Sequence, residues 1–176
     1  MRDLGWVLAA GAVVVGVTVS ATGPTPPRPA LTMAHPSSTA ELVALEAKVS
    51  KDPADADALA TLATEYLGRG APGIAVAALD RSPEPVRRRA AVLDLRARAL
   101  TELGAPRAAL ESQRQALEAC ASEPCGRALW GRGERRARFL EEMVRLGVED
   151  PARDPNGALA AYRLAIREVG LEMNAR

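Results

Sequence analysis

An identical Gly-Ala-Pro triplet occurs twice in the chain, at residues 70–72 and 104–106, which are 34 residues apart. The register continues beyond the triplet, because Ala75 and Ala109 follow it at the same offset. A fixed period of this length, with two helices joined at a glycine, is typical of helical hairpins stacked as a solenoid. The period therefore predicts that successive helix pairs bury their apolar faces against one another.

Apolar residues recur at helical spacing over most of the chain after residue 38, and no segment after Pro24 alternates as a strand would. Alanine is abundant and β-branched residues are scarce beyond the N-terminus, which favours helices packed closely through small side chains. Ser38 and Glu41 have the spacing of a capping box at the start of the first helix. We predict an all-α fold with helices at 38–51, 55–70, 73–81, 86–103, 107–121, 128–146 and 157–169.

The first copy of the period resembles the tetratricopeptide repeat. The resemblance rests on residues at the family's characteristic positions, which here are Leu59, Leu62, Ala63, Tyr66 and Ala75. A second copy around 93–116 fits less closely, and a third is divided by a longer loop at 148–156. Together the copies cover residues 52–169. The resemblance implies a short solenoid of antiparallel helical hairpins within a domain at 39–176.

In tetratricopeptide arrays the first helix of each pair lines a concave groove that binds peptides or partner helices, and the resemblance implies such a groove here. Asp94 and Arg98 are four residues apart on one helix face, where opposite charges can hold a polar partner. The outward-facing positions on the predicted first helices form the candidate partner site: Asp57, Thr64, Asp94, Arg98, Thr101, Glu134, Glu141 and Arg145.

The N-terminus carries an uncharged apolar run at residues 4–21. Eighteen residues of helix reach about 27 Å, close to the thickness of a bilayer's hydrocarbon core. The run is therefore either a retained signal anchor, which its length favours, or a cleaved signal peptide, for which small residues before Thr22 provide a cleavage pattern. We expect a signal anchor or signal peptide at 1–21. Residues 22–38 hold five prolines and are expected to form an extended linker.

Two cysteines, Cys120 and Cys125, flank the predicted end of a helix and its turn. Their spacing differs from the two-residue spacing of thioredoxin-type, haem-attachment and zinc-knuckle pairs. In an exported protein such a pair favours a structural disulfide, and two free thiols or a redox-active pair are the alternatives.

Charge and composition exclude several functions. The 23 basic residues against 22 acidic ones give a net charge of +1, without the basic excess of a nucleic-acid-binding protein. One histidine, His35, and two cysteines argue against a metal cage or a catalytic triad, so we expect no catalytic residue, metal or cofactor. Basic runs at 87–89 and 132–138 are interpreted as solvated helix faces, with a patch for anionic lipid or an acidic partner as the alternative.

These features together predict a non-catalytic adaptor that binds a protein or peptide partner through its groove, in envelope complex assembly. Arginine far outnumbers lysine, which is typical of GC-rich bacterial coding. We expect an inner-membrane protein with its repeat domain in the periplasm, or a periplasmic protein if the signal is cleaved. The alternative is a periplasmic biogenesis factor of the cytochrome c maturation type with a redox-active Cys120–Cys125 pair. The sequence does not indicate an oligomeric state.

Overall fold

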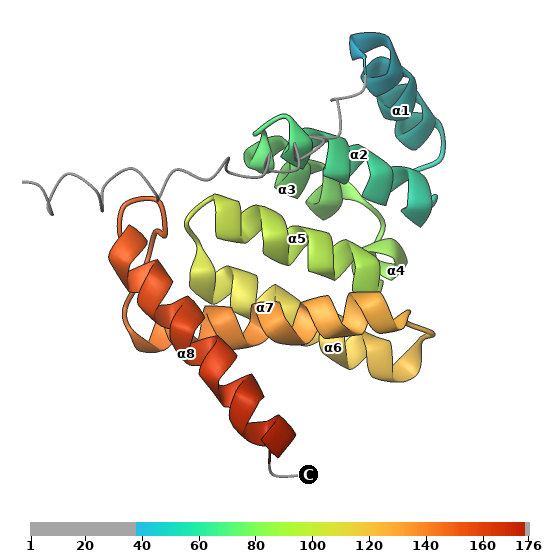
Figure 1. The fold of residues 1–176 in the computed structure, drawn as a ribbon. Helices are drawn as coiled ribbons and strands as arrows, with labels where there is room; N and C mark the ends of the chain where they lie inside the picture. Colours follow the sequence, from blue (N-terminus) through green and yellow to red (C-terminus); the bar gives the residue numbers. More distant parts are fainter. Residues whose placement is uncertain (1–37, 175–176) are drawn as a thin grey trace, which may run out of the picture. The chain divides into compact units, whose positions relative to one another are not determined.

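The computed structural model describes residues 38–174, which form eight helices and no strand (Figure 1). All eight helices lie in one compact unit. They are α1 (Thr39–Lys51), α2 (Ala56–Gly68), α3 (Pro72–Arg81), α4 (Glu84–Arg87), α5 (Ala90–Glu102), α6 (Pro106–Ser122), α7 (Arg127–Arg145) and α8 (Pro155–Asn174). The expected all-α fold is confirmed for the described residues.

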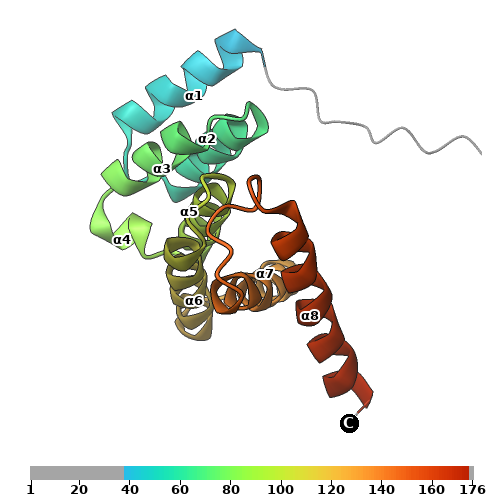
Figure 2. The same ribbon diagram turned by 90° about the vertical axis from the view of Figure 1, so that its left-hand side faces the viewer.

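The long helices pack in the order of the chain. Contacts join α1 to α2, α2 to α3, α3 to α5, α5 to α6, α6 to α7, and α7 to α8. Figure 2 shows α1 beside α2 at one end of this succession and α8 beside α7 at the other. The described part of the chain is therefore a repeat-like array of the helix pairs α2/α3, α5/α6 and α7/α8.

Small side chains lie where neighbouring helices meet. Ala63, Ala75, Ala97, Ala99 and Ala109 are all fully buried. Alanine at these positions lets helix axes approach closely, while larger apolar side chains fill the space on either side. Two buried apolar clusters result, one joining α2, α3, α4 and α5 and the other joining α5 to α8.

The same turn ends the first helix of each pair. Gly70, Gly104 and Gly147 have φ values of 68°, 72° and 72°, in the left-handed region that glycine adopts without steric cost. The residue after each glycine donates its N–H to a carbonyl in the last turn of the preceding helix, at 2.9 Å in all three cases. This arrangement satisfies carbonyls that the end of a helix would otherwise leave unpaired. The repeated triplet thus encodes a helix stop, and Gly147 supplies a third one.

Two helices differ from the sequence prediction. The expected helix at 86–103 is divided into α4 and α5, because Arg89 adopts an extended backbone with ψ 136°. The N–H of Ala90, at the start of α5, donates to the Glu123 carboxylate at the end of α6. α8 begins at Pro155 and extends to Asn174, so it is longer at both ends than the expected 157–169.

The expected signal segment at 1–21 lies outside the described residues, as does the proline-rich linker apart from Ser38. Within residues 38–174, none of the helices combines the length and apolarity needed to cross a bilayer.

Candidate functional site

On α2, the predicted site residues Asp57 and Thr64 are both exposed. The Thr64 hydroxyl donates to the carbonyl of Ala60 at 2.8 Å, so it bonds to its own helix. These two side chains stand on the outside of α2 without forming a joint polar cluster.

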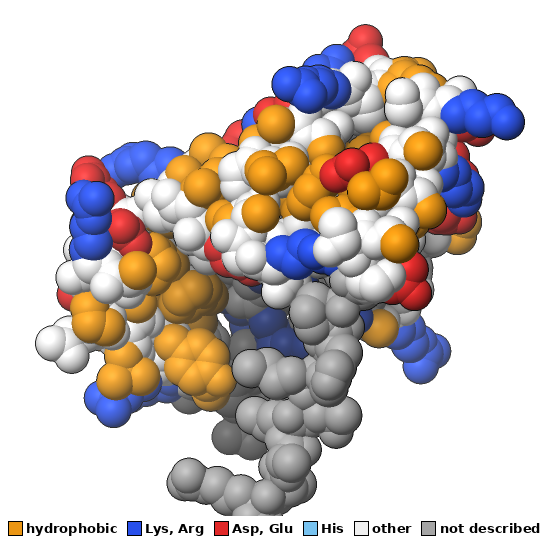
Figure 3. All heavy atoms as spheres, turned by 90° about the horizontal axis from the view of Figure 1, so that it is seen from above, with side chains coloured by type: hydrophobic (Ala, Val, Ile, Leu, Met, Phe, Trp, Pro, Cys, Tyr) orange, Lys and Arg blue, Asp and Glu red, His pale blue; other side chains and the backbone are white. Residues whose placement is uncertain are grey.

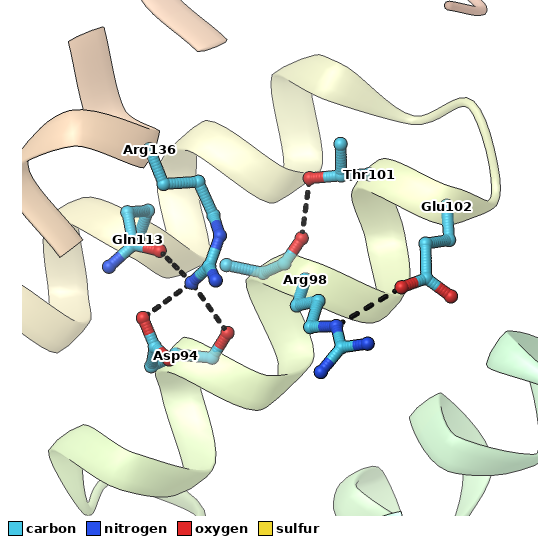
Figure 4. A network of polar contacts seen from close by, with 7 residues as sticks. Asp94, Arg98, Thr101, Glu102, Gln113 and Arg136 are labelled. Atoms are coloured by element: carbon cyan, nitrogen blue, oxygen red, sulfur yellow. Dashed lines mark hydrogen bonds and ion pairs between the residues drawn. The ribbon is translucent and has the colours of Figure 1, made fainter. Parts of the chain in front are cut away.

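On α5, Asp94 is 6% exposed, so the prediction that it points outward is wrong. Its carboxylate forms an ion pair with Arg136 of α7, which also donates to the Asp94 carbonyl at 3.3 Å. The same guanidinium donates to Gln113 of α6 at 2.9 Å (Figure 4). A buried carboxylate needs a cation and hydrogen bonds to offset its lost hydration. Asp94 therefore belongs to an internal network that joins three helices.

Arg98 lies one turn further along α5 and takes another partner. Its Nε is 3.1 Å from the Glu102 carboxylate, four residues on in the same helix (Figure 4). The Thr101 hydroxyl donates to the Ala97 carbonyl at 2.8 Å. The expected pairing of Asp94 and Arg98 as one dipolar contact surface is therefore not formed.

On α7, the predicted residues are divided among different contacts. Glu134 is exposed, Glu141 pairs with Arg114 of α6 at 2.9 Å, and Arg145 pairs with the buried Glu142 three residues before it. Arg136, which the sequence analysis placed in the basic run interpreted as a solvated helix face, instead reaches from α7 to the Asp94 carboxylate of α5. The eight predicted positions thus do not form one continuous surface.

A second polar contact joins consecutive helix pairs. Arg96 of α5 pairs with Asp80 of α3 at 2.7 Å and donates to the buried Ser112 hydroxyl of α6 at 2.6 Å. Arg96 and Arg136 each connect three helices. Both arginines therefore hold neighbouring helix pairs together.

A pocket of about 540 Å³ lies between α7 and α8, and the sequence prediction did not find it. Phe139 and Tyr162 meet there edge to face, with ring centroids 6.3 Å apart. Arg135, Arg136, Ala165 and Ile166 complete the lining. Figure 3 shows hydrophobic side chains gathered over α8, with basic side chains at the edge of that group. Exposed apolar surface of this kind is typical of a binding site.

Cys120 and Cys125 form a disulfide at the end of α6. Between them, Glu123 pairs with Arg89 at 2.8 Å and accepts the N–H of Ala90. The disulfide-bonded cysteines therefore flank Glu123, whose carboxylate caps the N-terminus of α5. None of the described residues forms a cluster of histidine, cysteine and carboxylate side chains suited to a metal ion.

Three titratable groups near the start of the array have shifted pKa values. Burial, together with a hydrogen bond to Glu46, raises the pKa of Tyr66 to about 12. Asp55 caps α2 by accepting the N–H of Ala58, and this bond, with the ion pair to Lys48, lowers the pKa of its carboxyl group. The hydrogen bond to Asp55 raises the pKa of Lys48. These shifts belong to the contact between α1 and α2 and lie away from the pocket.

Comparison with models of known protein families, with curated proteins and with solved structures finds no match to this chain.

Proposed function

We propose that this chain is a non-catalytic adaptor of tetratricopeptide type, which binds a protein partner and is tethered to, or exported across, a bacterial inner membrane. The repeat assignment is supported by three successive helix pairs whose first helices end at Gly70, Gly104 and Gly147 with the same left-handed turn. The disulfide supports an oxidising compartment such as the periplasm.

One observation carries the binding proposal, which is the apolar pocket left open between α7 and α8. Tyr162 and Ile166 expose large apolar side chains there, and burying them against a partner would be favourable. The groove expected along the first helices gives weaker support for partner binding, because Asp94 and Arg98 already have partners within the chain.

Site-specific photo-crosslinking of the full chain in its native cell envelope tests this function. A photoreactive phenylalanine analogue at position 162 should give discrete adducts with another protein, because Tyr162 lines the pocket. The same analogue at Ile74, an exposed apolar side chain on α3, is the matched control. Absence of protein adducts from both positions would contradict the adaptor function.

A further inference from the structure

The second helices of the three pairs start in the same way. Pro72, Pro106 and Pro155 are the first residues of α3, α6 and α8. The seventh residue after each proline is Leu79, Gln113 or Tyr162. Leu79 and Gln113 are each 1% exposed, whereas Tyr162 is 54% exposed. The same structural position is therefore buried in two pairs and open in the third.

The difference follows from what packs on each second helix. α3 is covered by α5, and α6 is covered by α7, the first helix of the following pair in each case. None of the described residues forms a further helix after α8. The fourth residue after each proline also becomes exposed only on α8, since Val76 is half-buried, Leu110 is buried and Leu159 is exposed. α8 thus presents an apolar face at the place where an array would add another helix.

In a repeat array, a helix face that meets water is normally polar, and an apolar face is covered by a neighbouring helix. Leu159, Tyr162 and Ile166 instead follow one another at spacings of three and four residues along α8. This spacing aligns them in a single stripe, which matches the anchor spacing of a helix laid alongside.

Basic side chains border the stripe on both sides. Arg135 lies on the α7 side and lines the pocket. Arg163 and Arg167 each follow a stripe residue on α8, so a rotation of about 100° places them along its other edge. All three are exposed, and none forms an ion pair with another side chain that the structure describes. A ligand for this face should carry negative charge beside its apolar residues.

We infer that α8 binds an acidic amphipathic α-helix of a partner protein, which packs on Leu159, Tyr162 and Ile166 as the next first helix of the array would. The partner's apolar residues fill the pocket between α7 and α8. Its carboxylates pair with Arg135, Arg163 and Arg167. This inference rests on the proposed adaptor function and specifies the class of partner that it takes.

A synthetic helical peptide tests the inference against the full chain in nanodiscs of zwitterionic phosphatidylcholine, which has no net charge. The probe has about 18 residues, long enough to form a helix, with leucines in an i, i+3, i+4, i+7 pattern and glutamates on both flanks. A version of the same peptide with lysine flanks and a sequence-scrambled version are the controls. Fluorescence anisotropy should give saturable binding of the glutamate peptide alone. Equal binding of the lysine or scrambled peptide would overturn the inference.

Matched variants locate the binding surface. Ile166→Asp should weaken peptide binding by about tenfold or more, since it puts a charge in the apolar stripe. Ile74→Asp, at an equally exposed isoleucine on α3, should leave the affinity unchanged. Arg163→Glu with Arg167→Glu should slow association most strongly at low salt, whereas Arg107→Glu on α6 should have no such effect. Circular dichroism of each variant checks that the fold is kept, and the arginine variants test the surface independently of Ile166.

Two outcomes separate this inference from the adaptor function. If position 162 crosslinks to a partner while the glutamate peptide does not bind, the adaptor function stands and the acidic helix is the wrong ligand. If sedimentation velocity reveals a dimer that Ile166→Asp dissociates, a second copy of this chain covers α8, and the inference fails.

Discussion

At the scale of single residues, Tyr66 links apolar packing within α2 and α3 to a polar contact with α1. Its ring packs against the buried cluster around Leu59 and Leu79, and its hydroxyl donates to Glu46 at 2.6 Å. α1 buries no residue of its own, so this hydrogen bond is one of the few specific contacts that fix it. Tyr66 therefore matters for docking α1 as well as for filling the core.

The raised pKa of Tyr66 gives a pH dependence with a definite sign. Its pKa is about 12 in the folded chain against 10.0 for an unperturbed tyrosine, so the folded state holds the proton more tightly. The stabilisation is therefore complete below about pH 10 and is lost as the pH rises towards 12. A Tyr162→Phe background leaves Tyr66 as the only tyrosine, and its ultraviolet absorbance should titrate near pH 12. Between about pH 10 and pH 12, the free energy of unfolding of Tyr66→Phe should depend less on pH than that of the chain that retains Tyr66. Titration at the ordinary tyrosine value would contradict the burial of the Tyr66 hydroxyl together with its contact with Glu46.

Replacing Gly70 or Gly73 by alanine should have different effects on the free energy of unfolding. Gly70 has φ 68°, which an alanine side chain adopts only with strain, so Gly70→Ala should lower the free energy of unfolding by about 1 kcal/mol. Gly73 lies inside α3 with open space around it, so Gly73→Ala should be neutral or stabilising by up to about 1 kcal/mol. Urea denaturation measures both changes. Similar effects of the two substitutions would contradict the assigned turn.

At the scale of helices, the Arg136 guanidinium holds α7 against α5 and α6. Arg136→Met should leave the Asp94 carboxylate poorly solvated and without its cation, lowering the free energy of unfolding by about 2 kcal/mol or more. Arg132→Met, at an exposed arginine one turn earlier on α7, should change it by less than about 0.5 kcal/mol.

A double variant separates the charge pair from simple loss of packing. Asp94→Leu with Arg136→Met should recover much of the stability lost in Arg136→Met, because no unpaired charge remains. Additive losses in this cycle, measured by urea denaturation, would show that the two side chains act separately.

The start of α5 depends on a residue from another helix. Glu123→Ala should cost about 1 kcal/mol, the ordinary value of an N-terminal cap, since Glu123 accepts the Ala90 N–H. Glu118→Ala, at an exposed position on the same helix α6, is the control and should be close to neutral. Hydrogen exchange should show faster exchange at Ala90 in the first variant alone. Unchanged exchange in both variants would argue against the cap.

The helices could largely be predicted from the sequence because their signals are local. Capping by Ser38 and the stops at Gly70 and Gly104 involve only neighbouring residues. The break before α5 could not, because it depends on Glu123, 33 residues away. The predicted partner site was wrong at Asp94 for a similar reason. Asp94 has the spacing of an exposed residue, and its partner Arg136 lies 42 residues further on.

The pocket itself left a weak sequence signal. Tyr162 follows Pro155 by seven residues, as Leu79 follows Pro72 and Gln113 follows Pro106. Its exposure, however, depends on whether another helix covers α8, and a single position does not encode that.

At the scale of the whole molecule, the proposed tether can be tested on the full chain. If residues 4–21 are retained as an anchor, the protein should stay in the membrane pellet after high-salt and carbonate washing. The physical reason is that an apolar helix of bilayer length leaves lipid only at a large cost. N-terminal sequencing of the mature protein provides the check. A product beginning at Thr22 would mean that the segment is cleaved and that the repeat domain is released.

The bond from Ala90 to Glu123 also bears on the order in which the chain can fold. During synthesis or export from the N-terminus, α5 emerges before the residue that caps it, so its first turn stays incomplete until α6 has formed. The Cys120–Cys125 disulfide closes around Glu123 only after that stage of synthesis. The pair α5/α6 is therefore expected to form as one cooperative unit in the middle of the array, to which α2/α3 and α7/α8 can add from either side.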